Sequence, residues 1–280
     1  MSDLSFCARQ VQRLDNDRFL CALFAPASER EALCAVYAFN IEVARARDAV
    51  REPMLGRIRL QWWWQAIADI YARKAPREPV AVALADAIAR FDLSRGHFEC
   101  LLRGREFDYQ DQPPCSLEDL VAYASTTSTP LVKLSAEVCG VRCDRIADVA
   151  DDMGIAWALT GLVRAVPFHA RARRLYLPTA LFDAHSVDQF ALFEKGFVPG
   201  LDKVVAAVSD RAVFHLVRAR DARGKVPRSA LPAFLPATLA SRYLKRIAAA
   251  GHNPFSTRVQ DVGVVDRPMA LLLNRLRQRY

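Results

Sequence analysis

The feature that most constrains the fold is a succession of long helical segments with little competing strand signal. The chain contains no Asn-Gly hairpin turn and few alternating β-branched runs. Apolar residues with helical spacing recur between proline and glycine breaks along the whole length. The predicted helices are 29–52, 56–74, 79–91, 94–110, one beginning after Ser116, one from Asp144 to Pro167, 188–194, 201–222, 237–250 and 267–279. The sequence therefore predicts an all-α protein.

Helix boundaries are indicated by capping residues and prolines. Ser28 with Glu31 has the capping-box spacing ahead of the first long helix, and Pro53 is predicted to end that helix. Ser116 with Asp119 has the same spacing ahead of a later helix. These signals are local, so they predict helix ends without reference to the rest of the chain.

Size and composition predict one large bundle. The chain has 280 residues, 52% of them apolar and 25% charged, which is typical of a globular protein with a substantial core. No internal repeat, low-complexity linker or composition break divides it. We therefore predict a single all-α domain over residues 1–280.

Charge and cysteine usage narrow the classes of partner and compartment. The net charge of +8 favours contact with anionic lipid, phosphate or an acidic protein surface. No basic block interleaved with aromatic residues appears, so nucleic acid is not an expected partner.

Seven scattered cysteines in apolar runs predict buried thiols in a reducing compartment, without a zinc set. The longest apolar run, 153–163, is far short of the roughly 20 residues that a membrane span needs.

Two segments carry a family resemblance. "YAFNIEVARARDAV" (37–50) and "GIAWALTGLVRAVPFHARARRLYLP" (154–178) resemble the two signature helices of the squalene and phytoene synthases. Those enzymes are all-α prenyltransferases that condense two prenyl diphosphates, using carboxylates on facing helices to hold Mg²⁺ against the leaving diphosphate. The resemblance covers essentially the whole chain and implies the isoprenoid synthase bundle.

The departures from these signatures fall on the metal ligands. Ala44 and Arg45 replace the first two aspartates of the first signature, and only Asp48 remains. Ala158, Gly161 and Ala165 replace Gln, Asn and Asp of the second signature, and His169 replaces its last acidic residue. The resemblance therefore implies no catalytic residues and no metal site. The remaining ligand- or anion-binding candidates are Tyr37, Glu42, Asp48, Arg164, His169, Arg174 and Tyr176.

The N-terminal element also departs from the family pattern. The synthases carry His-Ser-x-Ser-Phe, which would touch diphosphate, whereas this chain reads "DNDRF" at 15–19 and keeps only Phe19. Small residues at Gly154, Ala158, Gly161 and Ala165 form one stripe. Two interpretations of the stripe remain open: a remodelled apolar cavity for a lipid chain, or close packing of a neighbouring helix.

A narrower resemblance points to one branch of the family. Asn40, Glu42 and Asp48, "RLQWWW" from Arg59, the loop "VPFHARARRLYLP" and "VPRSALPAFLP" resemble the synthase-like assembly factors of respiratory complex I. Those proteins are thought to act without synthase chemistry. The resemblance implies a complex I subunit or assembly intermediate as partner, and no cofactor. The expected location is the cytoplasm, with peripheral attachment to the inner membrane as an option.

Two further sets of residues are candidates for partner or membrane contact. Trp62, Trp63 and Trp64 are consecutive, so on a helix they point in three directions. Two interpretations remain open: one of them is a surface anchor, or neighbouring helices of the bundle cover all three. Arg171 and Arg173 lie in a basic loop after Pro167. Either set could contact an acidic partner or lipid headgroups.

Two other functions remain as alternatives. The chain could be a prenyl-diphosphate transferase that binds Mg²⁺ through Glu42, Asp48 and His169, although Glu42 and Asp48 do not share a helix face. It could instead be a lipid-binding module that uses the old substrate tunnel without turnover.

Overall fold

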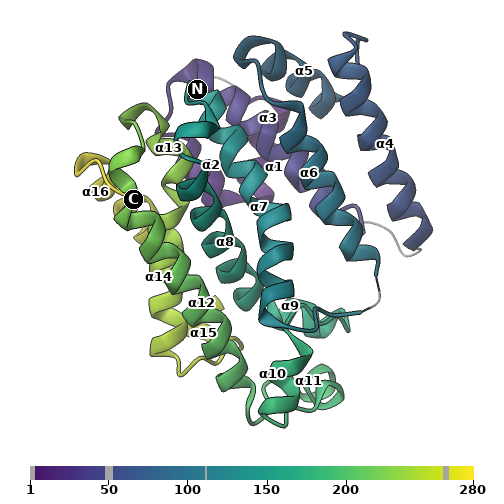
Figure 1. Ribbon diagram of the computed structural model, residues 1–280, viewed down its shortest axis with the longest axis vertical. Coiled ribbons are helices and arrows are strands. Elements are labelled where there is room, and N and C mark those ends of the chain that lie inside the picture. The colour runs from purple at the N-terminus through teal and green to yellow at the C-terminus, as the bar shows by residue number, and fades with distance from the viewer. Residues whose placement is uncertain (1–3, 48–52, 111, 261–264) are drawn as a thin grey trace.

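The computed structural model describes residues 4–47, 53–110, 112–260 and 265–280, and every regular element in those ranges is a helix (Figure 1). The α-helices are α1 (Phe6–Leu14), α2 (Asn16–Ala22), α3 (Ala27–Ala44), α4 (Pro53–Tyr71), α5 (Pro79–Phe91), α6 (Arg95–Arg105), α7 (Leu117–Val138), α8 (Ala147–Arg164), α9 (Val166–Arg171), α10 (Thr179–Ala184), α11 (Gln189–Lys195), α12 (Leu201–Asp221), α13 (Leu231–Phe234), α14 (Pro236–Ala249), α15 (Thr257–Gln260) and α16 (Asp266–Leu276). Four short 3-10 turns join them: η1 (Glu106–Tyr109), η2 (Cys143–Arg145), η3 (Arg223–Lys225) and η4 (Arg228–Ala230). The predicted all-α class is confirmed.

Two apolar cores meet along α7. The first core joins α1, α3, α4, α5 and α6, and the second joins α8, α12 and α14. Helix α7 contributes Leu131 and Leu134 to the first core and Leu120 and Val132 to the second. Figure 1 shows this division, with α4 and α5 at one edge, α14 and α16 at the other, and α7 and α8 between them. Helices α7 and α8 are therefore the framework on which both halves pack.

Local signals predicted some boundaries correctly. Helix α5 has the predicted bounds, 79–91. The capping box ahead of α7 is formed in both directions: Ser116 N–H donates to Asp119 Oδ2 at 2.9 Å, and Asp119 N–H donates to Ser116 Oγ at 3.1 Å. These features depend only on residues within one turn of each other.

Other predicted boundaries were wrong. Helix α3 begins at Ala27 and ends at Ala44, so Ser28 lies inside it and the Ser28–Glu31 capping box does not form. Pro53 is the first residue of α4 instead of the terminator of α3. Proline suits the first turn of a helix because its missing N–H would have had no intrahelical acceptor there. The same rule explains why Pro167 lies in the first turn of α9, after α8 has ended at Arg164.

The two N-terminal helices were not predicted. Ser5 Oγ accepts a hydrogen bond from Ala8 N–H at the start of α1, and Asp15 Oδ1 accepts one from Arg18 N–H at the start of α2. Helix α1 packs on α3, and α2 lies against α3, α13, α14 and α16. This arrangement brings the "DNDRF" segment into the middle of the bundle.

The described cysteines mostly agree with the prediction of buried thiols. Cys7, Cys21, Cys34 and Cys139 are buried, whereas Cys115 is exposed. Burial raises the pKa values of Cys7, Cys34 and Cys139 to about 12, so these thiols stay protonated at neutral pH.

No described helix combines the length and the apolar character that crossing a bilayer requires.

Candidate functional site

The interior between the signature helices is occupied by an arginine. Arg18 of α2 extends between the rings of Tyr37 on α3 and Trp157 on α8, with its Cζ atom 5.8 and 5.4 Å from the two ring centroids. Its guanidinium also pairs with Asp15 at 2.6 Å. Cation–π contacts of this kind stabilise an arginine among aromatic rings. Arg18 is therefore held inside the bundle at the position where the synthase pattern has its second serine.

Little space remains around Arg18. Tyr37 is 2% exposed, and its Oη atom lies 3.2 Å from Ser135 Oγ on α7. The cavity bounded by Arg18, Tyr37, Trp157 and the side chains around them has a volume of about 10 Å³. That is near the lower limit for a single water molecule. This part of the interior cannot hold a prenyl chain in the arrangement described.

Arg164, one of the predicted anion-binding residues, is paired with an internal carboxylate. Asp17 of α2 lies 3.6 Å from Arg164 Nη1. Asp17 also accepts hydrogen bonds from Tyr243 Oη on α14 at 2.7 Å and from Arg267 on α16 at 2.8 Å. The Arg164 guanidinium lies over the Tyr243 ring, 3.6 Å from its centroid. Asp17 thus supplies inside the fold the negative charge that an external anion would bring.

Glu42 is engaged on the other side of α3. It accepts a hydrogen bond from Gln10 Nε2 of α1 at 2.5 Å and forms an ion pair with Arg59 of α4. Asp48 lies outside the described residues. Within the described ranges, no three His, Cys, Asp or Glu side chains gather as a metal site would require.

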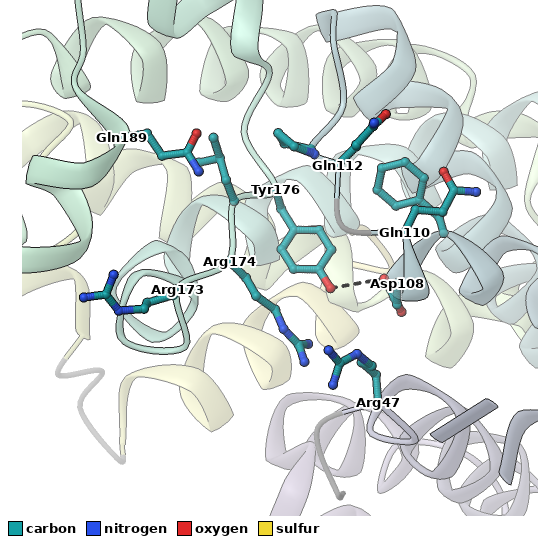
Figure 2. A pocket seen from close by; sticks show the side chains of 11 residues that line it. Arg47, Asp108, Gln110, Gln112, Arg173, Arg174, Tyr176 and Gln189 are labelled. Atoms are coloured by element: carbon teal, nitrogen blue, oxygen red, sulfur yellow. Dashed lines mark hydrogen bonds between the residues drawn. The ribbon is translucent and has the colours of Figure 1, made fainter. Parts of the chain in front are cut away.

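Arg174 and Tyr176 lie together in a second, polar pocket. This pocket has a volume of about 180 Å³ and lies between η1, the end of α3 and the loop after α9 (Figure 2). Figure 2 shows the guanidinium groups of Arg47 and Arg174 pointing toward one another beside the Tyr176 ring. Arg173 also lines the pocket and forms an ion pair with Glu194. The pocket wall is therefore rich in arginine.

A buried aspartate fixes the tyrosine in this pocket. Asp108 accepts hydrogen bonds from Tyr123 Oη at 2.7 Å and from Tyr176 Oη at 3.2 Å, and its Oδ2 lies 3.4 Å from Arg105 Nη1. Burial raises the pKa of Tyr123, and the Asp108 charge raises it further, so the phenol remains a donor. Sequence reasoning missed Asp108, Arg105 and Arg47 because no local motif marks them.

The predicted residues of the α9 region are partly brought together. The His169 ring lies 4.5 Å from the Tyr176 ring, and Arg174 N–H donates to the His169 carbonyl at 2.9 Å. Arg171 is exposed. The structure thus groups His169, Arg174 and Tyr176, and leaves Tyr37 and Arg164 in a separate part of the interior.

The three tryptophans differ in their exposure. Trp63 is 1% exposed and packs edge-on against Phe39 at 5.1 Å. Trp64 is half-buried, and Trp62 is 45% exposed. Trp62 is therefore the member of the set that is available to a partner, and such a contact stays a prediction.

The stripe of small residues on α8 has two different environments. A Cβ atom at Gly154 would lie 2.7 Å from Thr129 Cα and 2.8 Å from Thr129 N, so this glycine lets the backbones of α7 and α8 approach closely. A Cβ atom at Gly161 would meet no atom within 4 Å, and Gly161 is exposed. The close-packing interpretation holds for Gly154 but not for Gly161.

Comparison with known proteins agrees with this architecture. A family model described as squalene/phytoene synthase matches residues 11–264. A complex I assembly factor 6 of Bos taurus is 30% identical over 275 residues, which cover 98% of this chain and 82% of that protein. A phytoene synthase of Rhodobacter capsulatus is 25% identical over 75% of this chain and 62% of its own length.

A solved structure shows the same fold. The crystal structure of a dehydrosqualene synthase with bound ligand superposes with a TM-score of 0.85 at 18% identity, covering 97% of this chain and 95% of that one. The order of the signature segments, the all-α bundle and the family match over most of the chain agree with one another. This chain belongs to the squalene/phytoene synthase family.

Proposed function

We propose that residues 1–280 form a single domain that acts as an assembly factor for respiratory NADH dehydrogenase (complex I) and does not transfer prenyl groups. The observation that carries the proposal is the similarity to complex I assembly factor 6, which extends over 98% of this chain. The similarity to the phytoene synthase is lower and covers less of both chains.

The interior supports the non-catalytic part of the proposal. A prenyl transferase needs a cavity for its hydrocarbon substrate, and the space around Arg18 has a volume of only about 10 Å³. It also needs free cationic groups or metal ions for diphosphate, whereas Arg164 and Arg267 share the internal carboxylate of Asp17. The same small volume counts against a lipid bound between Arg18, Tyr37 and Trp157.

The partner is proposed to be a complex I subunit or assembly intermediate, met in the cytoplasm at the inner membrane. Trp62 is a candidate contact because it is a large, exposed aromatic side chain. Arg171 and Arg173 are exposed as well, and Arg173 lines the arginine-rich pocket. Such groups favour an acidic partner surface.

A deletion strain tests the assembly role. We expect loss of assembled complex I, measured by native gel electrophoresis and NADH oxidation in membranes. A plasmid copy of the gene should restore it, and so should an Asp48→Asn copy, because the proposed role does not use magnesium-bound diphosphate. Normal amounts of complex I in the deletion strain would contradict the assembly role.

Incubation with substrate tests the enzymatic alternative separately. Purified protein with Mg²⁺ and farnesyl or geranylgeranyl diphosphate is expected to give no condensation product above background. A product that disappears in the Asp48→Asn variant would show that the chain is a synthase with altered ligands. Native mass spectrometry of the purified protein is expected to show no apolar molecule bound inside the bundle.

A further inference from the structure

A basic groove lies among the C-terminal helices of the bundle, and Figure 1 shows α14 and α16 at the opposite edge from α4 and α5. It runs between α12, α14 and α16 and has a volume of about 570 Å³. Five cationic side chains line it: Arg220, Arg242, Lys245, Arg246 and Arg277. None of the residues predicted from the family signatures lines this groove. Because its lining residues lie outside the two signature segments, it is a separate candidate site.

Arg220 is the most constrained of these cations. It is partly buried, its only hydrogen bond among the described side chains goes to Ser241 Oγ at 3.3 Å, and its Nε atom is buried without a partner. Burial, together with the charge of nearby Arg223, lowers the pKa of the Arg220 guanidinium. Within the described ranges no carboxylate lies at ion-pair distance from it. A buried cation of this kind is stabilised when an anion binds beside it.

The remaining charges in the groove are only partly balanced. Asp266 pairs with Arg246 at 2.7 Å and lies 3.6 Å from Arg242. Lys245 and Arg277 form no ion pair with any carboxylate in the described part of the chain. Three uncompensated cations, those of Arg220, Lys245 and Arg277, therefore line the same groove. Arginine and lysine together favour a phosphate group.

One wall of the groove is apolar and continues onto the surface. Leu273 of α16 lines the groove and is 47% exposed. Val265, Met269, Leu272 and Leu276 are also exposed, at spacings of three or four residues that place them with Leu273 on one face of α16. We call these five residues the α16 apolar face.

The opposite face of α16 is fixed to the bundle. Leu271 is buried, Asn274 donates to Thr238 Oγ1 at 2.8 Å, and Arg267 pairs with Asp17. The helix is therefore held in place with its apolar face turned outward, next to the cationic groove. A ligand that matches both surfaces has an anionic head and hydrocarbon chains. That combination is the chemistry of an anionic phospholipid in a membrane.

We propose that the groove between α12, α14 and α16 binds the phosphate of an anionic phospholipid, and that the α16 apolar face lies in the membrane surface. This proposal specifies the membrane contact named in the proposed function and rests on that contact. It does not depend on the assembly role. The phosphate sits among Arg220, Lys245 and Arg277. The leucines of α16 enter the boundary between headgroups and acyl chains.

Vesicle flotation of the full chain tests this site. We expect binding to vesicles of phosphatidylcholine mixed with phosphatidylglycerol and little binding to phosphatidylcholine alone. The triple variant Arg220→Gln, Lys245→Gln, Arg277→Gln is expected to bind about a hundredfold more weakly, since each basic residue near an anionic surface contributes several-fold. The variant Leu272→Ser, Leu276→Ser should also lose binding because it removes apolar contact area.

A matched control variant distinguishes the effect of the groove on vesicle binding from the effect of net charge. Arg13, Arg77 and Lys203 are exposed and form no ion pair within the described ranges. Changing these three to Gln removes the same charge and should weaken binding by less than tenfold. Equal losses in the two triple variants, or equal binding to both kinds of vesicle, would overturn the proposal.

Competition with soluble phosphate distinguishes a lipid headgroup from a free phosphate ion as the ligand of the groove. Inorganic phosphate and glycerol phosphate should compete only weakly with the mixed vesicles, because they lack the hydrocarbon contact. Binding of soluble phosphate in the groove without any vesicle binding would overturn the lipid assignment. Circular dichroism melting confirms that each variant is folded. The vesicle result is independent of the deletion strain, so failure of one does not imply failure of the other.

Discussion

Replacing Asp17 with alanine is expected to lower the free energy of unfolding by about 3–5 kcal/mol, the usual cost of removing one partner from a buried ion pair. Asp17 is 8% exposed and is the shared partner of Arg164, Tyr243 and Arg267. Without it, two guanidinium groups inside the bundle lose their counter-charge. The contacts that tie α2 to α8, α14 and α16 are lost with it.

Urea unfolding followed by circular dichroism measures this loss. Asp210 is exposed and has no ion pair in the described residues, so Asp210→Ala is the matched control and should stay within about 0.5 kcal/mol of the wild type. Asp17→Asn keeps an acceptor but removes the charge, and should fall between the two. A loss below about 1 kcal/mol for Asp17→Ala would show that this cluster contributes little to stability.

The same variant tests whether Asp17 takes the place of an external anion. Sulfate or pyrophosphate should raise the melting temperature of Asp17→Ala more than that of the wild type, because the variant exposes Arg164 and Arg267 to an added anion. Equal shifts in the two proteins would mean that the arginines do not form an anion site once Asp17 is removed.

Gly154→Ala is expected to destabilise the protein by about 2–3 kcal/mol, toward the upper end of the cost of overpacking. The new methyl group would lie 2.7 and 2.8 Å from the Thr129 Cα and N atoms. These atoms belong to the backbone of α7, so no side-chain rotation relieves the contact. Helices α7 and α8 would have to separate, and both apolar cores share α7.

Gly161→Ala on the same helix provides the control. Its Cβ atom would meet nothing within 4 Å, and Gly161 is exposed, so the main effect is the gain in helix propensity. We expect about 0.5–1 kcal/mol of stabilisation. Thermal and urea unfolding of the two variants should therefore move in opposite directions. Shifts of the same sign would contradict the difference in packing along this stripe.

Two features of the candidate sites show where prediction from sequence stops. The signature motif placed Arg164 among the anion-binding candidates but did not predict its pairing with Asp17, which lies far earlier in the chain. Asp108 was not predicted, although it organises the pocket that holds Tyr176. Neither pairing has a sequence pattern, because each depends on helices that meet only in the folded bundle.

The sequence by itself determined the all-α class, the bounds of α5, the capping box of α7 and the family resemblance. Each of these depends on contacts within a few residues or on the order of motifs along the chain. Tertiary structure alone decided that Arg18 fills the interior, that Asp17 neutralises Arg164, and that Trp62 is exposed while Trp63 is buried. The physical reason is that helical periodicity specifies which side chains share a face, whereas charge pairing and cavity volume depend on which faces pack together.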